Sequence, residues 1–260
     1  LTLLTLATAA FALNSCSIMF DCEEGEGEIT SKTLMVDDFS EISLNGSMNV
    51  IVRNGKTQEV VVTGHPNIIE KMETDVRGSM WNVELESGCY TDYKLEVEIV
   101  IPELDKVLIN GSGAVAVDNF RDQSGDLELA IHGSGDIDLK SFRGIDDLHL
   151  SINGSGDINI YRMSDLDDLD AHIHGSGDIT FGKPFDVKHA AYHIHGSGDI
   201  EAFSAHSMDC QANTHGSGEI QTTTHGTLEA HLNGSGDVYF RGSGQVQEHV
   251  SGSGKVINEN

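Results

Sequence analysis

Acidic side chains recur at intervals of 18 to 21 residues, each directly after a Gly-Ser-Gly tripeptide. Carboxylates are the ligands that Ca²⁺ prefers in proteins. On stacked strands about 4.8 Å apart, such acids would repel one another by roughly 1 kcal/mol per neighbouring pair in water. A bound divalent cation would offset this repulsion, and so would hydrogen bonds from backbone N–H groups. These acids are Asp136, Asp157, Asp178, Asp199, Glu219 and Asp237.

Histidines are the second set of side chains that could bind a metal. Two pairs, His172 with His174 and His193 with His195, lie at alternate positions just before the tripeptide, so each pair would project from one face of a strand. Imidazole suits Zn²⁺, Ni²⁺ and Cu²⁺, but a solvated ladder of His and Asn is the alternative. We expect no required cofactor, with Ca²⁺ or an opportunistic transition metal as the candidates. The acids within 165–170 are expected to be solvated.

Basic and aromatic side chains coincide in one set of predicted loops. Aromatic rings beside cationic groups are typical of glycan-binding surfaces, although ordinary loop residues are the simpler interpretation. The set comprises Phe142, Arg143, Tyr161, Arg162, Phe181 and Lys183.

An enzyme is the main alternative to a binding protein, because parallel β-helices also host polysaccharide lyases and hydrolases. Such catalysis needs one constellation of carboxylates or bases in distinct environments. Here the acids repeat in coil after coil, so we expect no catalytic residues. A carbohydrate-active enzyme is the second interpretation and a divalent-cation-binding envelope protein the third.

The repeat that carries these residues predicts the elements that position them. Residues two, four and six positions before the tripeptide are mostly apolar, and apolar residues return at the second and fourth positions after it. Strict alternation indicates strands with one face inward. Each coil is therefore strand, glycine corner, strand and variable loop, which makes an all-β parallel β-helix with coils of about 21 residues. Heptads are excluded because a coiled coil would not tolerate Gly-x-Gly in every repeat. The tripeptides begin at Gly111, Gly133, Gly154, Gly175, Gly196, Gly216, Gly234 and Gly252.

The N-terminal part of the solenoid is less regular. We divide it into an irregular β region at 31–102 and the regular repeat at 103–260. A degenerate corner begins at Gly46, which precedes Gly111 by 65 residues, close to three periods. This region is expected to begin the solenoid and to cover its end.

Composition limits the partners. The chain has 260 residues, with 15 Lys+Arg against 42 Asp+Glu and a formal charge of −27. Nucleic-acid binding draws on clustered Lys and Arg, which are missing here, so we expect no nucleic acid. A glycan or a protein remains as the ligand, and the sequence leaves the oligomeric state open.

The first residues indicate export. Positions 1–15 have the character of a signal peptide truncated at its start, and Leu-Asn-Ser-Cys at 13–16 resembles a lipobox that would make Cys16 the lipid anchor. Cleavage after Ala12 is the alternative. An acidic tether at 16–30 would then join the anchor, the only expected membrane contact, to the body. The expected location is the outer membrane or cell surface, otherwise the periplasm. Cys22, Cys89 and Cys210 permit at most one disulfide, and Cys210, in an inward column, is expected to be a buried thiol.

An ordered series of short motifs resembles a known family, the head GIN domain of auto-transporter adhesins. The resemblance covers roughly residues 35 to 258 and implies an all-β, right-handed parallel β-helix at the cell envelope. The molecular function of that family is unassigned, so it contributes no functional residues. The motifs are Phe39-Ser40-Glu41-Ile42, Gly46-Ser47-Met48-Asn49-Val50-Ile51-Val52, Gly64-His65-Pro66-Asn67-Ile68-Ile69, Ile101-Pro102-Glu103-Leu104 and Asn110-Gly111-Ser112-Gly113.

Overall fold

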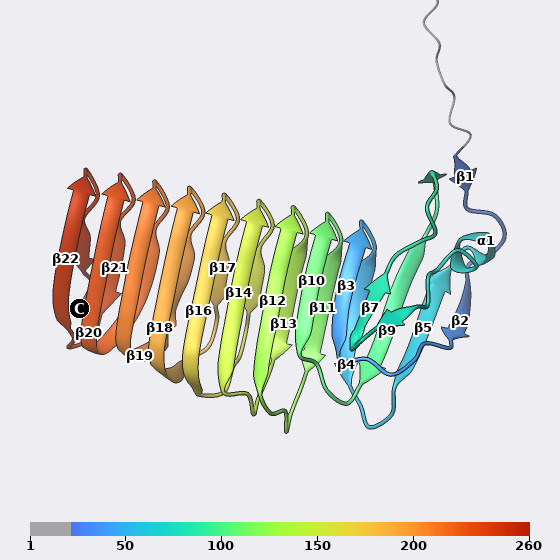
Figure 1. Cartoon of the computed structure of the whole chain (residues 1–260), viewed down its shortest axis with the longest axis horizontal. Helices are drawn as coiled ribbons and strands as arrows, with labels where there is room; N and C mark the ends of the chain where they lie inside the picture. The colour runs from blue at the N-terminus through green and yellow to red at the C-terminus, as the bar shows by residue number, and fades with distance from the viewer. Residues whose placement is uncertain (1–21) are drawn as a thin grey trace, which may run out of the picture.

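The chain folds into a β-solenoid with a repeat of roughly 21 residues, which confirms the predicted fold class. The computed structural model describes residues 22–260. In each regular coil one strand leads into the glycine corner and a second strand leaves it, so the solenoid has two parallel sheets. The corners line one edge, at the top of Figure 1, and the loops line the opposite edge.

The first sheet, here called the pre-corner sheet, contains the strands that end in the first glycine of each corner. Neighbouring strands are parallel and pair glycine with glycine, as in Gly133 with Gly154. All members therefore share one register. The strands are β3 (Glu41–Gly46), β10 (Lys106–Gly111), β12 (Asp126–Gly133), β14 (Asp147–Gly154), β16 (Leu166–Gly175), β18 (Phe185–Gly196), the ends of β19 (Ile200–Gly216) and β20 (Ile220–Gly234), and β22 (Gln245–Gly252).

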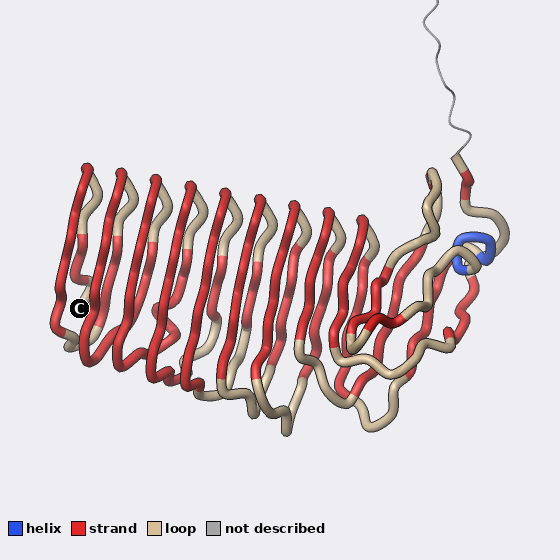
Figure 2. The backbone as a smooth tube through the Cα atoms, viewed as in Figure 1, coloured by secondary structure: helices blue, strands red, loops and turns tan. Residues whose placement is uncertain are grey.

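The second sheet, the post-corner sheet, contains the strands that leave the corners. Two of its strands, β19 and β20, run on into the pre-corner sheet without a loop, in coils of 20 and 18 residues; Figure 2 shows these continuous strands. The members are β4 (Asn49–Asn54), β11 (Ala114–Asn119), β13 (Asp136–Ser141), β15 (Ile158–Ile160), β17 (Ile179–Phe181), the starts of β19 and β20, β21 (Val238–Arg241) and β23 (Val256–Asn258).

The corners depend on glycine. Gly154 has a φ of 148°, and a Cβ placed there would overlap the carbonyl oxygen of Gly133 in the coil before it. The same carbonyl accepts a hydrogen bond of 2.9 Å from the N–H of Ser155. Close stacking of the corners therefore needs both the positive φ and the missing side chain.

The core lies between the two sheets and is built from columns of like residues. Ile131, Ile152, Ile173 and Ile194 form one such column, and each is fully buried. Burying an aliphatic side chain of this size contributes roughly 1.5 to 3 kcal/mol. The two-residue alternation in the sequence is thus the pattern of this core.

The chain between the corners at Gly46 and Gly111 is close to three periods long, yet it adds no regular coil between them. The strand β10 pairs directly with β3, and Gly111 lies opposite Gly46, so no coil separates the two corners. The intervening chain extends both sheets instead and closes the end of the solenoid. It forms β5 (Glu59–Gly64), α1 (Pro66–Ile69), β6 (Val76–Arg77), β7 (Met80–Val83), β8 (Tyr90–Thr91) and β9 (Leu95–Ile101).

These strands mix directions. The post-corner sheet continues from β4 to a parallel β9, an antiparallel β5 and an antiparallel β2 (Thr30–Leu34). The pre-corner sheet continues from β3 to β7 and β6. Trp81 is fully buried, and its Nε1 donates to the carbonyl oxygen of Glu73 at 3.1 Å. These added strands cover the N-terminal end of the core.

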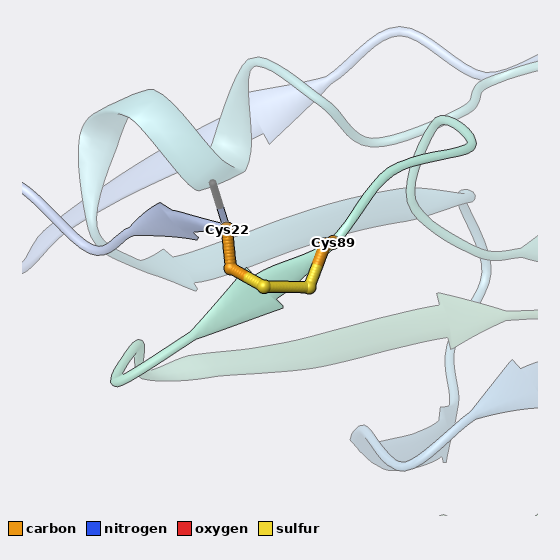
Figure 3. The surroundings of a disulfide bond; sticks show 2 residues. All are labelled: Cys22 and Cys89. Carbon is orange, nitrogen blue, oxygen red and sulfur yellow. A yellow bond between two sulfur atoms is a disulfide. The ribbon is translucent and has the colours of Figure 1, made fainter. Parts of the chain in front are cut away.

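The segment expected to be a tether is, from Cys22 on, part of the folded body. Cys22 forms a disulfide with Cys89, shown in Figure 3, which is the one bridge that the cysteine count allowed. Next to it, β1 (Glu23–Glu24) pairs with β8. The tether prediction for 16–30 is therefore wrong over 22–30, because a covalent bond and strand pairing hold this acidic stretch.

The predicted signal peptide, 1–15, and the lipid anchor Cys16 lie outside the described residues. Across 22–260, no helix is long and apolar enough to cross a membrane.

Candidate functional site

Hydrogen bonds link the corner acids from Asp136 to Glu219 into a ladder along the solenoid. The Oδ1 atom of one aspartate accepts the backbone N–H of the acid in the next coil: Asp157 from Asp178 at 2.9 Å, and Asp178 from Asp199 at 2.8 Å. The same contact joins Asp136 to Asp157, Asp199 to Glu219 and Asp237 to Lys255. These bonds give the aspartate carboxylates a structural role at the corner. Cation binding by the ladder stays a prediction.

Like charges still affect this ladder. Burial, opposed by the N–H of Asp199 and reinforced by the charges of Asp199 and Asp157, raises the pKa of Asp178. Burial and the charges of Asp199 and Asp237 raise the pKa of Glu219. Asp178 and Glu219 are therefore more easily protonated than free carboxylates are.

The predicted histidine patch exists on the outer face of the pre-corner sheet. His172 stacks on His193 with ring centroids 4.5 Å apart, and His174 stacks on His195 at 4.8 Å. The second stack continues to His215 at 4.7 Å. Burial and neighbouring histidines lower the pKa of His193 and of His195. Neutral rings at pH 7 can stack without repulsion and can bind a metal.

One carboxylate joins the first of these stacks. Asp170 lies two residues before His172 on β16, and its Oδ1 is 2.9 Å from His172 Nε2. One ligand atom each from Asp170, His172 and His193 lies within 4.8 Å of the other two. Sequence reasoning assigned Asp170 to a solvated stretch. The alternation that placed His172 on the outer face could have placed Asp170 beside it.

The predicted glycan-contact set separates into core and surface residues. Phe142 and Phe181 are 0% and 4% exposed, so these two predictions are wrong: both rings face inward and fill the core. Tyr161 is 53% exposed, and the ammonium of Lys183 lies 5.3 Å from the centre of its ring. Arg143 and Arg162 are exposed as well.

Tyr161 borders a groove of about 520 Å³ on the outer face of the post-corner sheet. The floor is one outward column of short side chains that pair across adjacent strands: Ala116, Asp138, Asn159 and Thr180. Lys140 and its ion-pair partner Asp118, 3.2 Å away, form part of the wall.

The groove ends at Gly182, where the outward column that contains Lys140 and Tyr161 has no side chain. Gly182 lines it next to Tyr161, and a Cβ there would press on the backbone and ring of Tyr161. Farther along this sheet, the guanidinium of Arg241 lies 3.8 Å from the ring centre of Phe203, a second cation–aromatic pair. The repeat is thus broken on this face, in contrast to the regular corner.

Cys210 carries no reactive chemistry. It is buried, and burial raises its pKa to about 11, although bonds from Thr222 and Thr224 oppose the shift. A thiol is a nucleophile only as the thiolate. The expected buried structural thiol is confirmed.

The geometry defines a class: a parallel β-solenoid with a grooved sheet on one side and a histidine-rich sheet on the other. The family model described as "Putative auto-transporter adhesin, head GIN domain" matches residues 38–180 and 128–244. The chain belongs to this family, as its motifs predicted. No curated protein matches the sequence.

Several solved structures share the fold. A protein from Parabacteroides merdae, described as an adhesin, is 21% identical, with a TM-score of 0.82, over 92% of this chain and 100% of its own. A protein from Parabacteroides distasonis, described as a lipid binding protein, is 23% identical with a TM-score of 0.80, over 92% and 99%. A Bacteroides fragilis protein, also described as an adhesin, is 19% identical, with a TM-score of 0.60, over 91% and 99%. At these identities the likeness shows the fold alone.

Proposed function

We propose that this protein is a non-enzymatic adhesin of the bacterial cell envelope that binds a glycan chain in the groove beside Tyr161. The observation that carries the proposal is the exposed Tyr161 ring at the edge of a column of short side chains. A pyranose ring offers one apolar face, suited to an aromatic ring, and hydroxyls, suited to Asp138, Asn159 and Thr180.

Three further features support this function. The groove crosses several coils of one sheet, which suits an extended chain more than a small molecule. The acids of the corner repeat from coil to coil and accept backbone hydrogen bonds, so they lack the distinct environments that acid–base catalysis needs. The family is described as "Putative auto-transporter adhesin, head GIN domain", which is compatible with this role. Lipidation of Cys16 would hold such a protein at the envelope, either in the outer membrane or facing the periplasm.

The test is a glycan array followed by calorimetry on the glycans that bind. Tyr161→Ala should weaken binding at least about tenfold, because a central aromatic contact is commonly worth about 1 to 2 kcal/mol or more. Tyr239→Ala is the matched control: Tyr239 is on the same sheet, outside the groove, and its loss should leave affinity unchanged. Glycan binding that survives Tyr161→Ala, or no glycan binding at all, would contradict the proposal.

Two competing functions can be tested with the same protein. Release of reducing sugars or unsaturated products from uronate polymers would support an enzyme. Binding to phospholipid vesicles that is lost with Tyr161→Ala would show that the groove binds a lipid. One of the Parabacteroides distasonis proteins with this fold is described as a lipid binding protein.

A further inference from the structure

Three side chains on the outer face of the pre-corner sheet combine the donors of a transition-metal site. Two imidazoles and a carboxylate, from Asp170, His172 and His193, lie within 4.8 Å of one another. This set is suited to Zn²⁺ and similar divalent metals, with open positions for water. We propose that these three residues bind one divalent transition metal ion per chain. The site lies on the opposite sheet from the groove and is independent of the proposed adhesin function.

Within the described chain, one carboxylate oxygen of Asp170, Oδ1, lacks a hydrogen bond of good geometry. This atom is buried, and among residues 22–260 no group makes a directed hydrogen bond to it, although His172 Nε2 is 2.9 Å away. A buried acceptor left without a partner destabilises the folded state, because it has lost its bonds to water. A metal ion bound to both atoms would satisfy the carboxylate.

Asn213 in the next coil orients the ring of the second histidine, His193. His193 Nδ1 lies 3.1 Å from the side-chain amide of Asn213 in the next coil. A metal-bound imidazole usually uses its other nitrogen for such a bond, which fixes the ring and its tautomer. Asn213 can present its oxygen to a protonated Nδ1 after an amide flip, which would leave Nε2 of His193 for the metal.

The surface around Asp170 also favours cations. Asp170 lines a groove of about 710 Å³ that it shares with three other acids and two histidines. Acidic walls raise the local concentration of cations. The remaining ionisable residues of this groove are His149, Asp168, His189, Asp209 and Glu229.

The same columns hold a second trio that provides an internal control. Glu229, His231 and His249 occupy the register positions of Asp170, His172 and His193 near the C-terminal end. There the longer Glu229 accepts a directed hydrogen bond from His231 Nε2 at 2.9 Å. This carboxylate is therefore satisfied by its neighbour and needs no metal.

The experiment is zinc titration of the EDTA-treated full chain, followed by calorimetry and thermal melting. We expect about one Zn²⁺ per chain, with micromolar affinity and a raised melting temperature. Asp170→Asn and His193→Ala should each weaken zinc binding at least about tenfold, whereas His231→Ala should leave it unchanged. Melting without metal verifies that each variant is folded.

Two outcomes would overturn the assignment. One is the absence of micromolar zinc binding to the intact chain. The other is zinc binding that survives Asp170→Asn but is lost in His195→Ala, which would place the ion on the neighbouring stack of His174, His195 and His215.

Discussion

The two ends of the solenoid differ: added strands extend the N-terminal end, whereas a coil of the regular repeat is the last one at the C-terminal end. At the N-terminal end, β9, β5 and β7 extend both sheets past the first corner, and Trp81 and Ile99 are fully buried there. At the C-terminal end, β22 is the last strand of its sheet in the described chain, and the inward positions Val246 and Val250 are 37% and 43% exposed. An inward residue is thus buried only when a neighbouring coil lies on both sides.

The last coil also carries a charge in an inward column. Glu248 pairs with Ala230 in register, where interior coils have Ala212, Tyr192 and Ala171. An inward-pointing charge at an open sheet edge disfavours the pairing of a further strand. In the described chain, added strands close the N-terminal end, whereas the last coil carries a charge in an inward column.

Replacing a corner glycine with alanine should destabilise the protein much more in an interior coil than in the first coil, and this is the largest difference that we expect. Gly154→Ala forces a Cβ onto the Gly133 carbonyl at a positive φ, whereas a Cβ at Gly46 meets nothing within 4 Å. We expect Gly154→Ala to cost about 4 kcal/mol or more, or to prevent folding, from strain plus overlap. Gly46→Ala should cost only the backbone strain, about 1 to 3 kcal/mol. Urea unfolding followed by circular dichroism measures both; equal costs would show that coil stacking is not the reason for glycine.

Truncating an inward side chain should lower the free energy of unfolding more in an interior coil than in the last coil. Leu129 is fully buried between two coils, whereas Val250 is partly exposed in the last coil. Leu129→Ala should lower the free energy of unfolding by about 3 to 4 kcal/mol through the lost contacts and the cavity. Val250→Ala should lower it by less than about 1 kcal/mol, because little apolar area is buried there. Urea denaturation measures both losses of unfolding free energy. An equal loss for Val250→Ala and Leu129→Ala would mean that another chain covers this end.

Removing the disulfide tests how the N-terminal end is held. Cys22→Ser with Cys89→Ser should destabilise the protein by about 2 to 4 kcal/mol, since the bridge joins residues 67 positions apart in the chain. Hydrogen exchange should rise in β1, β8 and α1, and it should stay unchanged in β20 and β22. Cys210→Ser in the oxidised protein is the control for thiol loss; if it alone reproduced the faster exchange at the N-terminal end, the role assigned to the bridge would be wrong.

The smallest effect concerns the acid ladder, where Asp178 lies between two acids and Asp237 is followed by Lys255. Because the folded pKa of Asp178 is raised above 3.8, its charge costs stability at neutral pH. That cost disappears as the pH falls through the raised value. Asp178→Asn, which keeps the acceptor oxygen, should therefore stabilise the protein by roughly a few tenths of a kcal/mol at pH 7 after solvent screening, but not at about pH 3. Asp237→Asn should give no such gain.

Thermal melts at neutral and acidic pH measure this difference. Asp178→Ala, which also removes the acceptor for the Asp199 N–H, should instead destabilise by about 1 kcal/mol. A stabilising Ala variant would show that the ladder hydrogen bond contributes nothing.

The regular coils could be predicted in detail from the sequence because their interactions are periodic. The alternation around each Gly-Ser-Gly determined which residues face inward, as the buried columns of Ile152 and Ile173 show. Repetition also fixed the register, since one-residue slips would place every apolar side chain in solvent. The predicted outer positions of His172 and His193 followed from the same rule.

Only the tertiary structure decided the rest. The path of the chain between Gly46 and Gly111 depends on long-range pairing of β3 with β10, which no local period encodes. Phe142 resembles a surface aromatic when only its loop neighbours are considered, yet its ring fills the core. Phe181, by contrast, is the fourth residue after its tripeptide, so the alternation already placed it inward. The alternation places Asp170 beside His172 on one strand, but only the stacking of coils 21 residues apart brings His193 to this pair. The sequence alone thus determined the repeating unit, because each coil meets nearly the same neighbours. The three-dimensional fold decided the sites, because they form where those neighbours differ.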